Sequence, residues 1–221
     1  MTYNSNIIKK VQCNKYIISS KPDIYIREKL DILLKTVEYN NRLLVIMMNP
    51  SIADDKTSDR TINKIIDYFN NNKCSINNIL GFKYISIVNL FSICCQNSKE
   101  LNSFFIQISE NGNDKLTKIV SDNRDVIRNK INESNYVVLG WGNSPDNFYE
   151  TCFHTEVLNV ISLLKELKKD DIYIFHIKNN RQPTKNILTN RKNPVHPSNG
   201  NINGLFKVEI DELNRIIINK K

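Results

Sequence analysis

Four short apolar runs stand out along the chain. They lie at residues 42–49, 83–91, 135–142 and 171–177, and each is rich in β-branched or aromatic residues without clean polar alternation. Strands that are buried on both faces of a sheet have this pattern, because neither side of the strand meets water. The pattern therefore predicts four fully buried strands.

Segments with helical spacing of apolar residues accompany these runs. In residues 58–72 the apolar positions share one helical face, with Ser58 as the expected N-cap, and residues 121–131 and 155–169 also predict helices. Residues 208–220 predict a closing helix. Buried strands that alternate with helices are typical of a three-layer α/β/α fold, so we expect a central, four-stranded, mostly parallel sheet.

The length of 221 residues suits a single domain, and no linker or internal repeat divides the chain. We therefore expect one domain over residues 1–221. Residues 1–40 are predicted to form an N-terminal extension on the sheet edge, folded either as a short hairpin or as a helix. No apolar run is long enough to cross a membrane, and the first residues lack the apolar stretch of a secretory signal.

The cysteine usage indicates a reducing environment. The chain contains five cysteines, an odd number, and two of them are the neighbours Cys94 and Cys95. Adjacent cysteines do not readily form a structural disulfide with each other. A reduced chain in the cytoplasm is the natural interpretation.

The formal net charge of +8 indicates an anionic partner, and nucleic acid is the commonest one. An AT-rich genome that loads the chain with lysine is the alternative explanation. The distribution of charge argues against it, because one stretch has five basic residues and no acidic one: Lys178, Arg181, Lys185, Arg191 and Lys192. Such a basic stretch is suited to phosphate contacts, so we expect DNA as the partner.

Polar or aromatic residues follow each of the predicted strands. Asn49 ends the first strand, Asn89 lies near the end of the second, Trp141 near the end of the third, and His196 lies in a Pro-rich loop after the fourth. Ligands of open α/β sheets bind beyond the carboxyl ends of the strands. These residues are therefore predicted to share one site at one edge of the sheet.

These segments together resemble the uracil-DNA glycosylase superfamily. The matching motifs, in the same order, are Asn49-Pro50, Asn89 within Ile-Val-Asn-Leu-Phe, Trp141-Gly142 and His196-Pro197-Ser198. The chain also resembles an uncharacterised bacterial family marked by Asn-Pro-Ser-x-Ala-Asp, Asn-Leu-Phe, Trp-Gly and His-Pro. The resemblance implies a uracil-DNA glycosylase-like fold and the hydrolysis of N-glycosidic bonds in DNA, without metal or cofactor.

The resemblance also implies roles for single residues. An amide such as that of Asn89 both donates and accepts hydrogen bonds, as the edge of a pyrimidine requires. His196 would donate a hydrogen bond to the base oxygen on which negative charge accumulates. The other predicted base contacts are Ser51, Phe91 and Trp141. The predicted DNA contacts are the basic stretch and the loop residues Pro197, Ser198 and Asn199.

Departures from the superfamily pattern change the expected chemistry. Asn49 stands where many uracil glycosylases have an aspartate that activates water, so it would only orient the water unless a nearby acid supplies a base. Asp54 is our candidate for that base, with Asp55 and Asp59 as alternatives. Ser51 replaces a tyrosine that excludes a 5-methyl group, which favours a bulkier or modified pyrimidine. Gly200 replaces a leucine wedge, a role for which Ile202 is the possible substitute.

Each of these residues also has a purely structural interpretation. Asn89 could cap a strand end, Trp141 could belong to the core, His196 could lie on a surface loop, and Asn49-Pro50 could form a turn.

Competing chemistries have less support. The His-Thr-Glu sequence at residues 154–156 mimics part of the zinc deaminase motif, but no Pro-Cys-x-x-Cys follows it. Phosphate-loop and nucleophile-elbow motifs are absent.

We therefore expect a monomeric DNA glycosylase that removes a damaged or modified pyrimidine and leaves an abasic site. Repair of DNA and attack on viral DNA with modified bases both fit this expectation. Two other hypotheses stay open. The chain could be a glycosylase-fold protein that binds DNA or a nucleotide without cleavage, or a basic α/β domain that contacts RNA or another protein.

Overall fold

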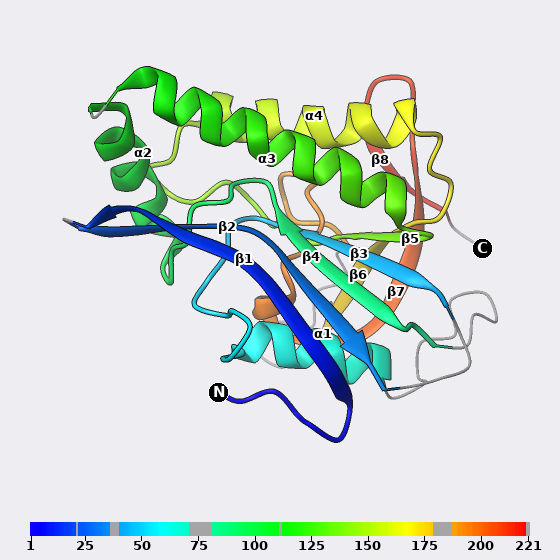
Figure 1. The fold of residues 1–221 in the computed structure, drawn as a ribbon. Helices are drawn as coiled ribbons and strands as arrows, with labels where there is room; N and C mark the ends of the chain where they lie inside the picture. The colour runs from blue at the N-terminus through cyan, green and yellow to red at the C-terminus, as the bar shows by residue number, and fades with distance from the viewer. Residues whose placement is uncertain (21, 36–39, 71–80, 111, 179–186, 220–221) are drawn as a thin grey trace.

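The structure is a computed structural model, and its described residues are 1–20, 22–35, 40–70, 81–110, 112–178 and 187–219. A single sheet runs through the centre of the molecule, with helices on both faces (Figure 1). Eight strands build this sheet within the described residues, in the order β1-β2-β4-β3-β5-β6-β7-β8. The strands are β1 (Ile8–Ser20), β2 (Asp23–Leu34), β3 (Arg42–Met47), β4 (Tyr84–Asn89), β5 (Tyr136–Leu139), β6 (Ile172–Lys178), β7 (Asn201–Ile210) and β8 (Ile216–Ile218).

The predicted fold class is wrong, because the sheet is mixed and has eight strands rather than four. Within the described residues, three neighbouring pairs are parallel and four are antiparallel. The four apolar runs do form strands, β4, β3, β5 and β6, and these pair in parallel at the centre. Antiparallel strands extend the sheet on both sides, so the architecture is not the uracil-DNA glycosylase-like sheet that we expected.

The N-terminal residues form a long antiparallel hairpin of β1 and β2, and β2 joins the sheet beside β4. The hairpin alternative is therefore confirmed for this segment, and the helix alternative is wrong. β1 is an edge strand that is mostly exposed or half-buried, whereas β2 buries every second residue over part of its length. Such partly solvated strands lack the continuous apolar run that marks the central strands.

The predicted closing helix is also wrong. Val208 and Ile210 end β7 and pair with Ile218 and Ile216 of β8. A turn joins the two strands, and the Asp211 carboxylate accepts a hydrogen bond from the backbone N–H of Arg215 at 2.8 Å. The apolar positions at 208, 210, 216 and 218 therefore follow the alternation of strands rather than the spacing of a helix.

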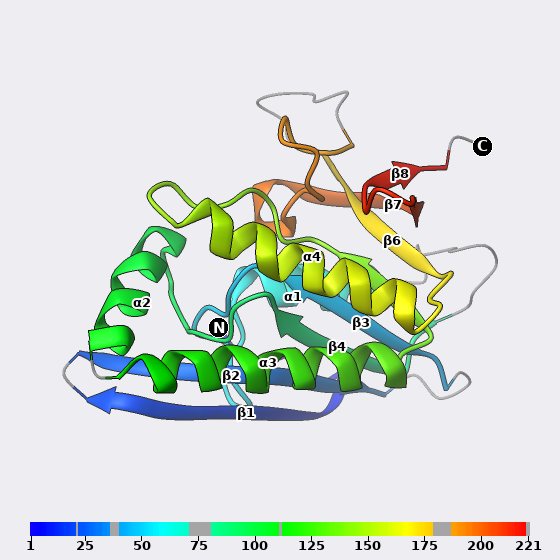
Figure 2. The same cartoon turned by 90° about the horizontal axis from the view of Figure 1, so that it is seen from above.

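The helices lie in two layers (Figure 2), as α1 (Arg60–Asn70), α2 (Leu101–Glu110), α3 (Asn113–Glu133) and α4 (Glu150–Glu166), with short 3₁₀ turns at Ser98–Glu100 and Pro197–Asn199. α1 covers one face of the sheet, and α2, α3 and α4 lie over the other. Asp59, rather than the predicted Ser58, caps α1, because its Oδ1 accepts from the backbone N–H of Ile62 at 2.8 Å. Ser58 is buried instead.

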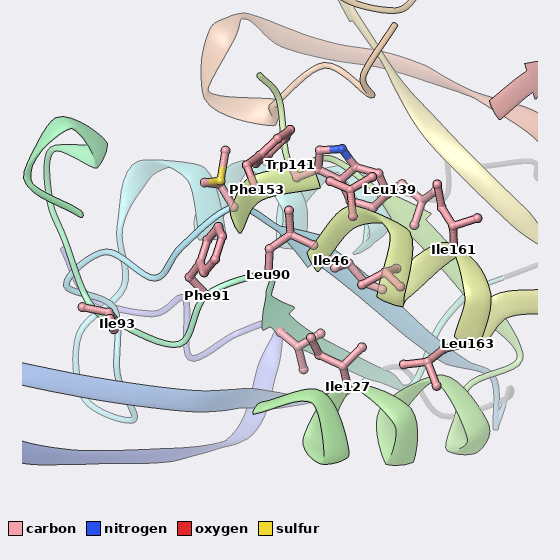
Figure 3. Close-up of a cluster of buried hydrophobic side chains, with 14 of the residues drawn as sticks. Ile46, Leu90, Phe91, Ile93, Ile127, Leu139, Trp141, Phe153, Ile161 and Leu163 are labelled. Carbon is pink, nitrogen blue, oxygen red and sulfur yellow. The ribbon is translucent and has the colours of Figure 1, made fainter. Parts of the chain in front are cut away.

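Two apolar cores fix the sheet against these layers. The larger core lies under α2, α3 and α4 and includes Trp141, Phe91 and Ile127 (Figure 3). The smaller core lies under α1 and includes Phe69 and Phe175. No helix in the part of the chain that the structure describes is long and apolar enough to span a membrane.

Candidate functional site

The carboxyl ends of the central parallel strands open into a cleft of about 550 Å³. Its walls come from the segments that follow β3, β4 and β5, from the first turn of α1, and from the loop between β6 and β7. A volume of this size is typical of small-molecule sites, which range from about 300 to 1,000 Å³. The cleft can therefore hold a single nucleotide unit.

Several of the predicted site residues meet in this cleft. The lining includes Asn49, Ser51, Trp141, His196, Ser198 and Asn199. Pro197, which lies between two of these residues in the sequence, is buried and packs close to Gly140, where an added Cβ would lie 3.2 Å from the proline ring. The convergence of residues that are far apart in the sequence follows from the parallel pairing of β3, β5 and β6.

Asn49 is held in a fixed orientation by main-chain acceptors. Its Nδ2 donates to the carbonyl oxygen of Pro50 at 3.2 Å and to that of Cys95 at 3.1 Å. Both amide hydrogens are therefore committed to the protein, and the side-chain oxygen remains as a hydrogen-bond acceptor. Since Asn49 lines the cleft, this oxygen can accept a hydrogen bond from a bound water or ligand.

His196 offers a hydrogen-bond donor, whereas Asn49 offers an acceptor. Its Nδ1 accepts from the backbone N–H of Ser198 at 3.2 Å and lies 2.7 Å from the Ser198 hydroxyl. Burial, with the nearby positive charge of Lys64, lowers the pKa of His196 from 6.5 to about 4. The ring is therefore neutral at pH 7. Because Nδ1 accepts, the proton of the neutral ring is on Nε2, which is a hydrogen-bond donor.

Two contacts hold the loop that carries His196. The Lys64 ammonium on α1 donates to the carbonyl oxygen of Pro197 at 2.7 Å and also to that of Gly200. Gly142 packs against the other side, since a Cβ added there would lie 3.2 Å from the Cβ of His196. Gly142 also has a φ of 76°, which other residues adopt only with strain. The loop that carries His196 is thus held between α1 and the turn after β5.

The acidic residue in the cleft is Asp59 and not the predicted Asp54. Asp54 closes a turn, because its Oδ1 accepts from the backbone N–H groups of Lys56 and Thr57 and from the Thr57 hydroxyl. Burial raises the pKa of Asp54, but these hydrogen bonds and Lys15 outweigh it and lower the pKa overall. Asp59 lines the cleft at the start of α1, beside the exposed Arg60.

Asn89 does not reach the cleft, which corrects its predicted role as the base reader. It is only 1% exposed, and its Oδ1 accepts from the guanidinium of Arg27 at 3.0 Å. Arg27 is equally buried, and burial lowers its pKa. Asn123 completes this buried polar cluster by donating to the backbone oxygen of Asn89 at 3.0 Å. The side chain of Asn89 therefore belongs to a buried cluster and lies outside the cleft lining.

The aromatic residues of the predicted base site are part of the core. Phe91 is buried and stacks edge-on against Phe105 and Phe148, with ring centroids 5.4 and 5.0 Å apart, so it makes no wall of the cleft. Trp141 is 1% exposed, although it lies at the cleft floor. Its indole N–H donates to the Oδ1 of Asn193 at 3.3 Å.

The basic stretch is only partly described. Lys178 is exposed at the end of β6, and Lys192 is exposed in the loop that follows. Arg191 forms an ion pair with Glu150 at the start of α4. Arg181 and Lys185 lie outside the described residues. Phosphate contact by Lys178 and Lys192, which are both exposed, stays a prediction.

The proposed wedge position has a structural explanation. A Cβ added at Gly200 would lie 2.5 Å from the backbone oxygen of Lys178, so the close approach to β6 requires glycine. Ile202, the suggested substitute, is half-buried in β7 and pairs with Ile177. Neither residue occupies the cleft.

The cleft lining also contains polar residues that the sequence patterns did not single out, among them Arg60, Gln96, Asn143 and Thr189. Arg60 follows the cap of α1, and Asn143 directly follows the Trp-Gly sequence. The position after a predicted strand was therefore a usable signal for Asn143, whereas Gln96 and Thr189 lie several residues from any strand end and carried no such signal.

Metal ligands do not gather anywhere in the described part of the chain, where no group of three or more His, Cys, Asp or Glu side chains could hold an ion. Cys13, Cys94, Cys95 and Cys152 are free thiols.

Comparison with known proteins gives the family. No curated protein and no solved structure matches the chain significantly. The model of a family described as "Protein of unknown function (DUF1643)" matches residues 32–198, which is more than half of the chain and includes most of the cleft. The chain therefore belongs to the DUF1643 family.

Proposed function

We propose that the protein is a DNA glycosylase whose cleft hydrolyses the N-glycosidic bond of a modified pyrimidine. The observation that carries this proposal is the pair of opposed, fixed groups in the cleft. His196 offers a neutral Nε2–H donor, and Asn49 offers a side-chain oxygen that can only accept. Breaking an N-glycosidic bond needs a donor for the departing base and an acceptor for the attacking water.

The reaction assigns a role to each group. The C1′–N bond breaks, and its electron pair leaves with the base, whose oxygen accepts a hydrogen bond from His196 Nε2. A neutral imidazole suits this role, because it stabilises the developing negative charge as a donor without first having to gain a proton. Water held by Asn49 forms the new bond to C1′. Its proton passes to Asp59, the carboxylate that lines the cleft.

The proposed substrate is DNA because of the charge around the cleft. Arg60 is exposed in the wall, and Lys178 and Lys192 are exposed on elements that lead into it. A modified pyrimidine is favoured because Ser51, a small residue, lines the cleft. The same proposal includes a monomeric, cytoplasmic enzyme that acts in DNA repair or against viral DNA with modified bases, without a metal or a cofactor.

The second candidate is a protein that binds a DNA nucleotide in this cleft without cleaving it. Two observations favour it. An asparagine at position 49 cannot take a proton from water, and one oxygen of Asp59 is already engaged as the cap of α1. Both limit the supply of a base for hydrolysis, while the binding groups are unaffected.

One assay separates the two candidates. Duplexes that carry natural or 5-modified pyrimidines are incubated with the protein and then treated with alkali, which breaks the strand at abasic sites. Breaks with the wild type that vanish in Asn49→Ala and His196→Ala support catalysis. Salt-sensitive binding without breaks on any duplex supports the binding protein, and absence of both binding and breaks rejects both candidates.

A further inference from the structure

Asn143 lies in the wall of the cleft, and a chain of hydrogen bonds fixes the direction of its amide. The chain begins at Trp141, whose indole N–H is a donor only and donates to the Oδ1 of Asn193 at 3.3 Å. The other end of the Asn193 amide is therefore its Nδ2, a donor. This Nδ2 donates to the Oδ1 of Asn143 at 3.3 Å.

Thr189 fits the same orientation. Its hydroxyl oxygen accepts from the backbone N–H of Asn193 at 3.1 Å, so its hydrogen is available to donate. The hydroxyl then donates to the Oδ1 of Asn143 at 2.6 Å. Two donors thus converge on one oxygen of Asn143. A flipped amide would place its NH₂ against the Nδ2 of Asn193, donor against donor, so Asn193 is the partner that fixes the direction.

The remaining group of Asn143 is an NH₂ donor at an exposed position of the cleft wall. Its Nδ2 has no acceptor among the described residues. Asn143 directly follows Gly142, which packs against the Cβ of His196, so the two residues are neighbours in the cleft lining. This part of the lining therefore carries two hydrogen-bond donors, Asn143 Nδ2 and His196 Nε2.

We propose that Asn143 determines specificity by donating a hydrogen bond to a carbonyl oxygen of the bound base. A base with an amino group at that point would oppose donor to donor, and an unpaired buried polar group costs more than a missing bond. The inference rests on the proposed function in one respect, because it takes the ligand to be a base in DNA. It does not require that the base be cleaved.

The test exchanges the polarity of the residue. Asn143→Asp keeps the oxygen that accepts from Thr189 and Asn193 but replaces the NH₂ donor with an acceptor. The two probes are oligonucleotides with 5-hydroxymethyl-2′-deoxyuridine or 5-hydroxymethyl-2′-deoxycytidine, which differ in the 4-oxo or 4-amino group and in the proton on N3 that accompanies the 4-oxo group. Fluorine at the sugar 2′ position prevents hydrolysis, because it destabilises a positively charged sugar. Binding is measured by fluorescence anisotropy.

The readout is the ratio of the two dissociation constants, since the added negative charge weakens both complexes alike. We expect the wild type to prefer the 4-oxo probe by about tenfold and Asn143→Asp to reverse the preference toward the 4-amino probe. Thr189→Val removes one of the two donors to the Asn143 oxygen and keeps the Nδ2 of Asn193, so it should reduce the preference without reversing it. Asn132→Asp, an equal charge change on the exposed end of α3, should leave the ratio unchanged.

The outcomes separate the specificity claim from the proposed function. Binding with an equal ratio in the wild type and Asn143→Asp overturns the role of Asn143 alone. Failure of the wild type to bind either probe, or any duplex, overturns this role and the proposed function together. A reversed ratio in a protein that cleaves no duplex supports Asn143 as the reader in a binding protein and rejects only the glycosylase.

Discussion

Two polar regions lie close to the carboxyl ends of the central strands, and they differ in the surroundings of their asparagines. In the cleft, main-chain and side-chain partners bind one end of Asn49 and of Asn143 and leave the other end open to a ligand. In the buried polar cluster of Arg27, Asn89 and Asn123, protein atoms also bind one end of each amide, but the other ends, Asn89 Nδ2 and Asn123 Oδ1, are buried without a partner among the described residues and lie outside the cleft lining.

Burial, and not residue type, therefore decides which asparagine can reach a ligand. Arg27 donates to the backbone oxygen of Ala53 at 3.0 Å, and this bond holds the segment that follows β3. Asn89 in turn gives that buried cation an acceptor. The buried cluster is therefore the support, and the cleft is the surface that meets the ligand.

His196→Ala should reduce the rate of abasic-site formation by about a hundredfold or more, because it removes the donor to the departing base. The thermal unfolding midpoint of the variant should stay close to that of the wild type, since the ring is half-buried at the rim. Rates are measured in single turnover. His196→Gln, which keeps an N–H donor, is the matched variant and should retain part of the rate. Equal rates in His196→Ala and wild type contradict the proposal.

Asn89→Ala should lower the stability of the protein and leave the reaction rate nearly unchanged. It leaves the buried Arg27 without its side-chain acceptor, so the free energy of unfolding should fall by about 2 kcal/mol. Denaturant titration measures this loss. The rate per folded molecule should change little, whereas Asn49→Ala should lose rate while keeping its stability. A large loss of rate in a folded Asn89→Ala protein contradicts the division of roles.

Acid should destabilise the protein through His196. Its pKa is about 4 in the folded protein and 6.5 without the fold, so the unfolded chain binds the proton more readily. Stability is therefore complete above pH 6.5 and decreases as the pH falls toward 4, by about 1–2 kcal/mol between pH 6.5 and 5. In His196→Gln this part of the pH dependence should be missing from denaturant titrations. Identical pH profiles would contradict the lowered pKa of His196.

Ser51→Tyr should narrow the cleft beside the position where a 5-substituent is expected. We expect the rate with a 5-hydroxymethyl pyrimidine to fall by about tenfold relative to the rate with the unsubstituted base. The measurement is the ratio of the two rates in the variant and in the wild type. Ser51→Ala is the control, since it keeps a small side chain and should leave the ratio near its original value.

The sequence allowed the central strands to be predicted, and the reason lies in their burial. Val45 and Ile174 sit in strands covered on both faces, so continuous apolar runs mark them. At either side of this centre, β7 was missed, β8 was taken for a helix, and the N-terminal hairpin was only one of two alternatives, because these strands are partly solvated and their apolar residues are fewer. Ile216 and Ile218 show the ambiguity, since a short apolar run fits a helix or a strand.

The candidate site was predictable in position but not in detail. Asn49 and His196 were found, because they follow predicted strands in the expected order and the parallel pairing brings them together. Asn89 follows a strand in the same way, but only the contact with Arg27, 62 residues away in sequence, reveals that it faces inward. Asn143 also follows a predicted strand, but it belongs to none of the four motifs of the superfamily resemblance, and so it was not predicted.

The most direct test of the central claim is the single-turnover rate of abasic-site formation in duplexes with 5-hydroxymethyluracil, compared among wild type, Asn49→Ala and Asn89→Ala. Each rate is divided by the folded fraction from denaturant titration at the same temperature. We expect the wild type to form abasic sites, Asn49→Ala to lose this activity, and Asn89→Ala to keep it. A rate that depends on Asn89 but not on Asn49 would contradict the account, because it would place the chemistry in the buried cluster rather than in the cleft.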